Sequence, residues 1–123
     1  MSIHHKILIA DDDAEMLETL SSLLAAEGYD IVRAENGQEA VELAAKELPA
    51  LVMLDIHMPV MDGLTACKTI KSDKLTKSVP VLMLTVEGSI HEIQQAISYG
   101  AKTYITKPSS RAEILKVVKS ILG

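Results

Sequence analysis

The chain has 123 residues, of which 48% are hydrophobic and 24% charged, so we expect one folded domain and not a disordered segment. Its net charge of −5 and its lack of Phe and Trp argue against a dedicated nucleic-acid-binding protein, which usually has a basic face and stacking aromatic residues. The single cysteine excludes an internal disulfide, and no apolar stretch is long enough to span a membrane. A cytoplasmic location is therefore expected.

Short apolar runs alternate with longer amphipathic segments along the chain. Continuous apolar runs predict strands buried on both faces at residues 6–10, 30–34, 50–54, 80–84 and 102–105. Five stripes at helical spacing predict helices, with apolar positions at Leu17, Leu20, Leu23 and Leu24; Val41, Ala44, Ala45 and Leu48; Leu64, Cys67 and Ile70; Ile90, Ile93 and Ile97; and Ile114, Val118 and Ile121. The alternation predicts an α/β fold, with a parallel sheet covered by helices on both faces.

Capping signals mark the ends of the predicted helices. Three residues precede a Glu by the three positions of a capping box: Asn36, Ser89 and Ser110. Asp13 is expected to cap the first helix, and Gly28 and Gly100 fall where glycine commonly ends a helix.

Polar side chains follow four of the predicted strands: Asp11, Asp12 and Asp13 the first, Asp55 the third, Thr85 the fourth and Lys107 the fifth. Each of them alone is commonly a helix cap, a turn residue or a solvated side chain, but the carboxyl ends of parallel strands share one edge, where ligands bind. Two unit charges about 4 Å apart repel by roughly 4 kcal/mol at an effective dielectric near 20, so converging carboxylates need a cation or protons. Carboxylate ligands favour Mg²⁺, Mn²⁺ or Ca²⁺, and a Lys and a Thr suit phosphate oxygens. The sequence therefore predicts that this edge of the sheet binds a phosphoryl group.

Four segments, in this order, resemble the receiver domain of two-component response regulators: KILIADDDAEM at 6–16, LVMLDIHMPVMDG at 51–63, VLMLT at 81–85 and YITKP at 104–108. The resemblance covers the whole chain and implies a flavodoxin-like, doubly wound (βα)5 fold with a five-stranded parallel sheet in the order 2-1-3-4-5. Residues 1–123 are expected to form a single receiver domain with no output domain, either as a protein of the stand-alone type or as a receiver domain excised from a longer protein.

The same resemblance implies the metal site and the phosphoacceptor. Asp55 matches the residue that accepts a phosphoryl group. Asp11 and Asp12 match the acidic pair that holds Mg²⁺ together with Asp55 and the backbone carbonyl of His57, and Mn²⁺ is a possible substitute. The residues that match the positions tuning the rates of phosphorylation and dephosphorylation are His57, Val86 and Glu87. Val86 is bulkier than the residue the family usually has there.

The resemblance also implies a switch. Thr85 matches the hydroxyl that closes onto the phosphoryl group, and Tyr104 matches the aromatic residue that moves inward with it. Lys107 matches the lysine that contacts a phosphoryl oxygen, and the bond between Lys107 and Pro108 is expected to be cis.

The implied protein is a regulator and not an enzyme, although it catalyses its own phosphorylation and dephosphorylation. Its expected partners are a sensor histidine kinase or a histidine phosphotransfer protein, and a downstream protein that binds the face made by the fourth helix, the fifth strand and the fifth helix. Direct nucleic-acid binding and membrane insertion are not expected, and the chain is expected to be a monomer or a weak dimer linked to phosphorylation.

Two alternatives remain open on the sequence. Asp11 and Asp13 imitate the DxD motif of haloacid-dehalogenase-type phosphatases, but Glu15 stands where that motif has Thr or Val, and no acidic pair follows Lys107. The other alternative is a receiver-like scaffold that binds partners without phosphorylation. Phosphorylation at Asp55 and not at Asp11 would distinguish the receiver from the phosphatase.

Overall fold

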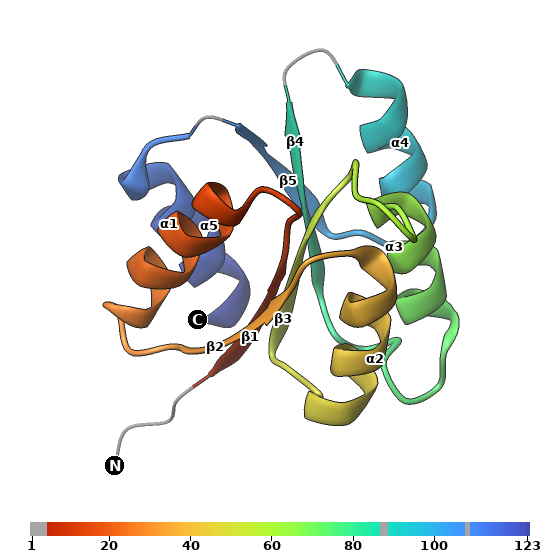
Figure 1. Ribbon diagram of the computed structural model, residues 1–123, viewed down its shortest axis with the longest axis horizontal. Helices are drawn as coiled ribbons and strands as arrows, with labels where there is room; N and C mark the ends of the chain where they lie inside the picture. The colour runs from red at the N-terminus through yellow and green to blue at the C-terminus, as the bar shows by residue number, and fades with distance from the viewer. Residues whose placement is uncertain (1–4, 87–88, 108) are drawn as a thin grey trace.

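The computed structural model describes residues 5–86, 89–107 and 109–123, in which five strands alternate with five helices (Figure 1). The strands are β1 (Lys6–Ala10), β2 (Asp30–Ala34), β3 (Leu51–Asp55), β4 (Val81–Val86) and β5 (Thr103–Lys107). The helices are α1 (Ala14–Ala25), α2 (Gly37–Glu47), α3 (Gly63–Ser72), α4 (Ile90–Ser98) and α5 (Arg111–Leu122). Within the described residues, no helix combines the length and apolarity needed to cross a membrane.

The five strands form one parallel sheet in the order β2-β1-β3-β4-β5, which confirms the predicted doubly wound fold. Figure 1 shows α1 and α5 on one face of the sheet and α2, α3 and α4 on the other. The chain runs outward from β1 to β2 and then returns to place β3 on the other side of β1. The winding direction therefore reverses between β1 and β3, and a crevice for ligands is expected at the carboxyl ends of these two strands.

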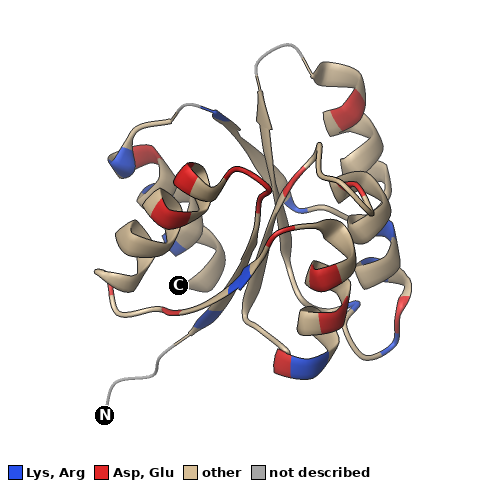
Figure 2. Cartoon of the chain, in the orientation of Figure 1, with Lys and Arg blue, Asp and Glu red and all other residues tan. Residues whose placement is uncertain are grey.

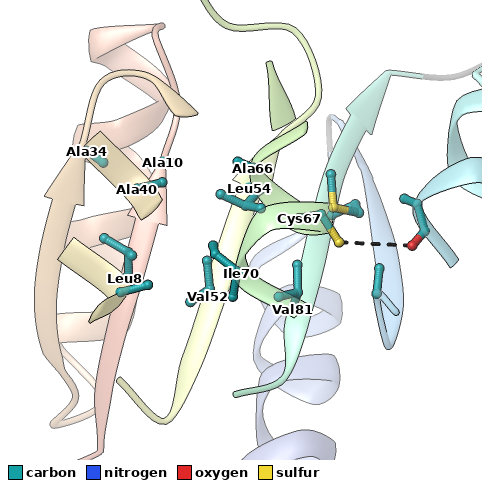
Figure 3. Packing of buried hydrophobic residues seen from close by; sticks show 14 of the residues in the cluster. Leu8, Ala10, Ala34, Ala40, Val52, Leu54, Ala66, Cys67, Ile70 and Val81 are labelled. Atoms are coloured by element: carbon teal, nitrogen blue, oxygen red, sulfur yellow. Dashed lines mark hydrogen bonds between the residues drawn. The ribbon is translucent and has the colours of Figure 1, made fainter. Parts of the chain in front are cut away.

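Two apolar clusters pack on opposite faces of the sheet. On the face covered by α2 and α3, Leu8 and Val52 pack with Ile70 and Cys67 (Figure 3). On the other face, residues that alternate with these along the strands, such as Ile7 and Met53, belong to a separate cluster with residues of α1 and α5. The three central strands are thus buried on both faces, as their continuous apolar runs predict.

The same prediction is wrong for the two outer strands. Asp30 and Arg33 of β2 are exposed, and so is Tyr104 of β5. Each outer strand has a neighbouring strand on one side only, so part of its surface remains in contact with water.

Three strands extend beyond their predicted ends. Parallel pairing continues as far as Asp55 in β3, where it is opposite Leu84, and as far as Val86 in β4, which is opposite Lys107. The polar residues expected in loops after the strands therefore occupy the last strand positions. Asp55, Thr85 and Lys107 are held in place by the sheet.

Most of the predicted helix caps are confirmed. Asp13 accepts hydrogen bonds from the amides of Glu15 and Met16, and Asn36 and Ser110 each accept one from the third residue after them. Ser89 is an exception, because it precedes α4 but makes no side-chain hydrogen bond to the helix.

Two predicted apolar stripes are only partly buried. Leu48 ends α2 in a left-handed conformation, with φ of 45°, and its side chain is exposed. In α4, Ile90 and Ile97 are 55% and 45% exposed, and Ala96 is the buried residue of the helix. The helix is thus amphipathic as predicted, but only Ile93 of its apolar stripe is half-buried, and the rest of the stripe is exposed.

Candidate functional site

Three carboxylates meet at the carboxyl edge of the sheet, at the expected crevice between β1 and β3. Asp11 directly follows β1, and its amide donates to the carbonyl of Ala34 at 3.1 Å. Asp55 is the last residue of β3. One carboxylate oxygen from each of Asp11, Asp12 and Asp55 lies within 4.8 Å of the other two. Figure 2 shows the acidic ends of β1 and β3 side by side.

Lys107 enters this acidic group from the end of β5. Its Nζ lies 2.7 Å from Oδ2 of Asp11 and 3.3 Å from Oδ1 of Asp55. The side chain of Lys107 is only 16% exposed, and that of Asp11 is fully buried. Burial opposes the charge on Lys107, but the bond to Asp11 and the charge of Asp55 outweigh it, so the pKa of the ammonium group is raised. Lys107 is a stable cation in this site.

The surroundings of Asp55 disfavour the negative charge on its carboxylate. Burial, followed by the nearby charge of Asp11, raises its pKa to about 6, although Lys107 partly offsets both effects. At neutral pH most Asp55 side chains are therefore ionised, at a cost in free energy that a bound cation would remove. Together with the convergence of the three carboxylates, this raised pKa fits a divalent cation held by oxygen ligands.

Asp11 and Asp13 have different surroundings, although both follow β1. The second oxygen of Asp11, Oδ1, accepts a hydrogen bond from the amide of Asp13 at 2.9 Å, so both oxygens of this buried carboxylate have partners. The side chain of Asp13 is instead exposed and used as the cap of α1. Asp12 is exposed beside the crevice, with its carboxylate available to a ligand.

A close backbone contact fixes the segment after Asp55. The amide of Gly63, the first residue of α3, donates to the carbonyl of Ile56 at 2.7 Å. A Cβ atom at Gly63 would lie 2.0 Å from the backbone carbonyl oxygen of Asp55. Only glycine fits here, because any side chain would push α3 away from the end of β3. The segment at 51–63 ends in Asp62 and Gly63. This contact explains the glycine, and Asp62 caps α3 by accepting a hydrogen bond from the amide of Thr65.

The next turn of the same segment is fixed from α2. The amide of Gly37 donates to the carbonyl of Met61 at 2.9 Å, and a Cβ atom at Gly37 would lie 2.2 Å from that oxygen. The amide of Met61 bonds in turn to the carbonyl of Pro59, around Val60, whose φ is 68°. The side chain of Val60 is exposed. The whole segment between β3 and α3 is thus held at both ends by backbone bonds.

Lys107 contacts the acidic group, but the other two residues of the expected switch, Thr85 and Tyr104, have different partners. Thr85 is buried, and its hydroxyl donates to the carbonyl of Val86 at 3.2 Å. Tyr104 lies opposite Met83 in the sheet and is 42% exposed. Val86 is also exposed. In this structure the hydroxyl of Thr85 is therefore directed along its own strand, and the ring of Tyr104 is on the surface.

His57 makes a contact that the sequence pattern did not predict. Its side chain is 69% exposed, and Nε2 lies 3.1 Å from Oε1 of Glu92 in the first turn of α4. The two residues are 35 positions apart, and no spacing rule connects them. Two other residues with expected roles, Glu87 and Pro108, lie outside the described residues.

A family model for the response regulator receiver domain matches residues 7–119 of the chain. The chain belongs to this family. Receiver domains act as regulators and not as classical enzymes, and they receive phosphoryl groups from histidine kinases. The resemblance of the four sequence motifs is confirmed at the level of the family.

Individual relatives agree with this assignment. The chain is 39% identical over 117 residues to the DNA-binding dual master transcriptional regulator RpaA of Synechocystis, covering 95% of this chain and 48% of RpaA. The chemotaxis response regulator CheY4 of Vibrio cholerae has the same fold, with a TM-score of 0.91, 30% identity, and coverage of 97% of this chain and 99% of that chain. The receiver domain of the sensor histidine kinase PA1611 from Pseudomonas aeruginosa was crystallised with a magnesium ion coordinated in its active-site cleft; it is 24% identical, with a TM-score of 0.90 and coverage of 98% of this chain and 100% of that chain.

This receiver domain spans about half the length of the curated relatives it matches, such as RpaA at 48% and the PhoP regulator of Bacillus subtilis at 49%. The names of these relatives describe transcriptional regulators.

Proposed function

We propose that this receiver domain accepts a phosphoryl group on Asp55 from a phosphohistidine, in a reaction that depends on Mg²⁺. The observation that carries the proposal is the group formed by Asp55, Asp11, Asp12 and Lys107. Three carboxylates within 4.8 Å of one another and a lysine 3.3 Å from Asp55 provide a nucleophile, metal ligands and a cation for phosphate oxygens at one place.

The proposed metal ligands are the carboxylates of Asp11, Asp12 and Asp55 and the backbone carbonyl of His57, and Mn²⁺ is expected to replace Mg²⁺. Mg²⁺ would supply positive charge next to the phosphoryl oxygens when it is bound. The raised pKa of Asp55 supports this assignment, since it reflects negative charge that the site itself only partly balances.

In the proposed transfer, a carboxylate oxygen of Asp55 forms a bond to phosphorus as the bond from phosphorus to the imidazole nitrogen of the donor breaks. The imidazole leaves with the electron pair of that bond. Lys107 would contact a phosphoryl oxygen and so stabilise the charge spread over the transferring group. Hydrolysis of the product by water would return Asp55 to its starting state. His57, Val86 and Glu87 are proposed to tune the rates of these two reactions.

The proposed response requires Thr85 to change its partner. Its hydroxyl now bonds to the carbonyl of Val86 and would turn to a phosphoryl oxygen, and Tyr104 would then move inward from its exposed position. Such a change would alter the face made by α4, β5 and α5, which we propose binds a downstream protein. The phosphoryl group acts here as a ligand that favours one of two conformations.

The donor is proposed to be a sensor histidine kinase or a histidine phosphotransfer protein. A receiver that works as a scaffold without phosphorylation remains the second candidate, and it is the one that the experiment below would favour if no phosphorylation is found. The phosphatase alternative is not proposed here, because the chain belongs to the receiver-domain family.

The test is incubation of the chain with Mg²⁺ and acetyl phosphate, followed by intact mass spectrometry. We expect a mass gain of one phosphoryl group, its loss when Mg²⁺ is removed by EDTA, and its loss in Asp55→Asn. Asp13→Asn is a matched control that changes a carboxylate of the same edge outside the proposed ligand set. Absence of any gain in the unsubstituted chain, with acetyl phosphate and with phosphoramidate as donors, would contradict the proposal.

A further inference from the structure

Helix α4 is attached weakly to the rest of the protein, and mainly at its C-terminal end. Ala96 is its buried residue, whereas α1 buries five residues. The carbonyl of Ala96 accepts a hydrogen bond from the amide of Ala101 at 3.0 Å and contacts the thiol of Cys67 at 4.0 Å. The ammonium group of Lys68 lies 5.3 Å from the centre of the Tyr99 ring. This end of α4 is joined to α3 through apolar and polar contacts.

Among the residues that the structure describes, the N-terminal end of α4 has fewer side-chain contacts than its C-terminal end. Ser89 provides no side-chain cap, and Ile90 is exposed. Glu92, at the third position of the helix, lies 3.1 Å from the imidazole of His57. A carboxylate near a helix N-terminus is favourable in itself, and here it also bonds to the segment that follows Asp55. The described contacts thus make Glu92 the side chain that ties this end of α4 to the site.

The partner of Glu92 is well placed to report on the site. His57 is two residues after Asp55, and it follows Ile56, whose amide bonds to Leu84 at 3.2 Å and whose carbonyl accepts the amide of Gly63. Because both backbone groups of Ile56 are hydrogen-bonded, Ile56 cannot easily move to compensate for a displacement of the backbone at His57. The imidazole needs a proton only on Nε2 to donate to Glu92, and a neutral ring has one in one of its tautomers.

We propose that Glu92 is a positioning residue that holds the first turn of α4 against His57, so that occupation of the Asp55 site is transmitted to α4 through this bond. The proposal rests on the proposed function, because it takes Mg²⁺ and a phosphoryl group as the occupants of the site. It describes a route to α4 that does not pass through Thr85. Glu92 touches neither Asp55 nor the proposed metal ligand atoms in the described contacts.

The test uses amide hydrogen exchange and chemical shifts of the full chain, with Mg²⁺ as the probe. The amide of Ile93 bonds to the carbonyl of Ser89 at 2.9 Å and reports on the first turn of α4, while that of Tyr99 bonds to Gln95 at 3.0 Å and reports on the last. In Glu92→Ala we expect exchange at Ile93 to rise two- to fivefold, as for the loss of one solvent-exposed hydrogen bond, with exchange at Tyr99 unchanged. A global loss of stability would raise both rates.

The decisive readout is the response of Ile93 to Mg²⁺. We expect Mg²⁺ to shift the amides of Asp12 and Ile56 in every variant with affinity within twofold of the original. The shift at Ile93 is expected to disappear in Glu92→Ala and to return in Glu92→Gln, whose amide oxygen still accepts a bond from His57. Glu113→Ala is the matched control, because Glu113 is exposed at the third position of α5.

Two results would overturn the proposal, and they differ from each other. If Ile93 of Glu92→Ala responds to Mg²⁺ as the original chain does, Glu92 does not transmit occupation of the site, and the proposed function is unaffected. If Mg²⁺ shifts neither Asp12 nor Ile56 in the original chain, the proposed metal site fails, and transmission of Mg²⁺ binding from it fails as well.

Discussion

The ammonium group of Lys107 is closer to Asp11, at 2.7 Å, than to Asp55, at 3.3 Å. The lysine is therefore bound mainly to the buried acidic residue after β1 and only secondarily to the proposed phosphoacceptor. A phosphoryl group on Asp55 would have to draw Lys107 toward itself and away from Asp11. A cation next to Asp11 would favour this exchange, because it would replace the charge that Lys107 now supplies.

The first prediction concerns Lys107→Ala. This change removes a cation that competes with Mg²⁺ for the carboxylates, so we expect Mg²⁺ to bind several-fold more tightly, as measured by isothermal titration calorimetry. Without a metal, the change leaves buried Asp11 unpaired, and the free energy of unfolding in urea should fall by about 3 kcal/mol.

Lys116→Ala, on the exposed side of α5, is the control and should leave both quantities near their original values. Weaker Mg²⁺ binding in Lys107→Ala would contradict the assigned competition between the lysine and the metal.

The second prediction concerns pH. Because the pKa of Asp55 is raised from 3.8 to about 6 in the folded chain, the folded state binds more protons than the unfolded state between these values. The contribution of Asp55 to stability is therefore present below pH 4 and is lost as the pH rises through about 6. Asp55→Asn should remove this loss and raise the free energy of unfolding at pH 7.5 in EDTA by about 1–2 kcal/mol, after allowance for partial solvent screening.

The measurement is a comparison of urea unfolding for both chains at several pH values. The difference between them isolates Asp55 from the other titrating groups. A difference that is the same at pH 4 and pH 7.5 would show that the pKa of Asp55 is not raised.

The third prediction concerns Gly63→Ala. A Cβ atom at this position would lie 2.0 Å from the carbonyl oxygen of Asp55, and backbone atoms would have to move to admit it. We expect a loss of about 3 kcal/mol in the free energy of unfolding, together with reduced phosphorylation, because the end of β3 is displaced. Gly28→Ala, where a Cβ atom would have open space but φ is 95°, should cost only about 1 kcal/mol. Equal losses for the two variants would contradict the steric argument.

The fourth prediction concerns Ser21 in α1. Its hydroxyl is buried and, among the described residues, it is the one buried side-chain polar group for which no hydrogen-bond partner is found. Such a group costs about 1–3 kcal/mol, so Ser21→Ala should stabilise the chain by about 1 kcal/mol in thermal or urea unfolding. Ser22→Ala is the neighbouring control, because it removes an exposed hydroxyl bonded to Glu18 at 3.1 Å. Destabilisation by Ser21→Ala would show that the hydroxyl has a partner in solution.

Much of the fold could be predicted from local patterns. The apolar runs of β1, β3 and β4 indicated buried strands, and Asp13 was expected to cap α1 as it does. The strand order could not be predicted in this way, because many orders satisfy the same alternation of strands and helices. It came from the resemblance to a family, whose motifs are specific enough to imply a topology.

The sequence predicts the position of those site residues that directly follow a strand. It does not predict contacts that depend on how the helices pack. Asp11 and Asp55 could be placed at one edge because parallel strands end there together. The contact between His57 and Glu92 could not be predicted, since it depends on how far the first turn of α4 lies from the end of β3. The exposure of Ile90 depends likewise on the position of α4, which periodicity does not report.

The central claim is that Asp55 carries the phosphoryl group, and site mapping tests it most directly. The chain would be incubated with Mg²⁺ and acetyl phosphate, treated with sodium borohydride to reduce the acyl phosphate to the homoserine side chain, and sequenced as peptides by tandem mass spectrometry. The account predicts homoserine at position 55 and at no other aspartate. Homoserine at position 11, 12 or 13 in place of 55 would contradict it.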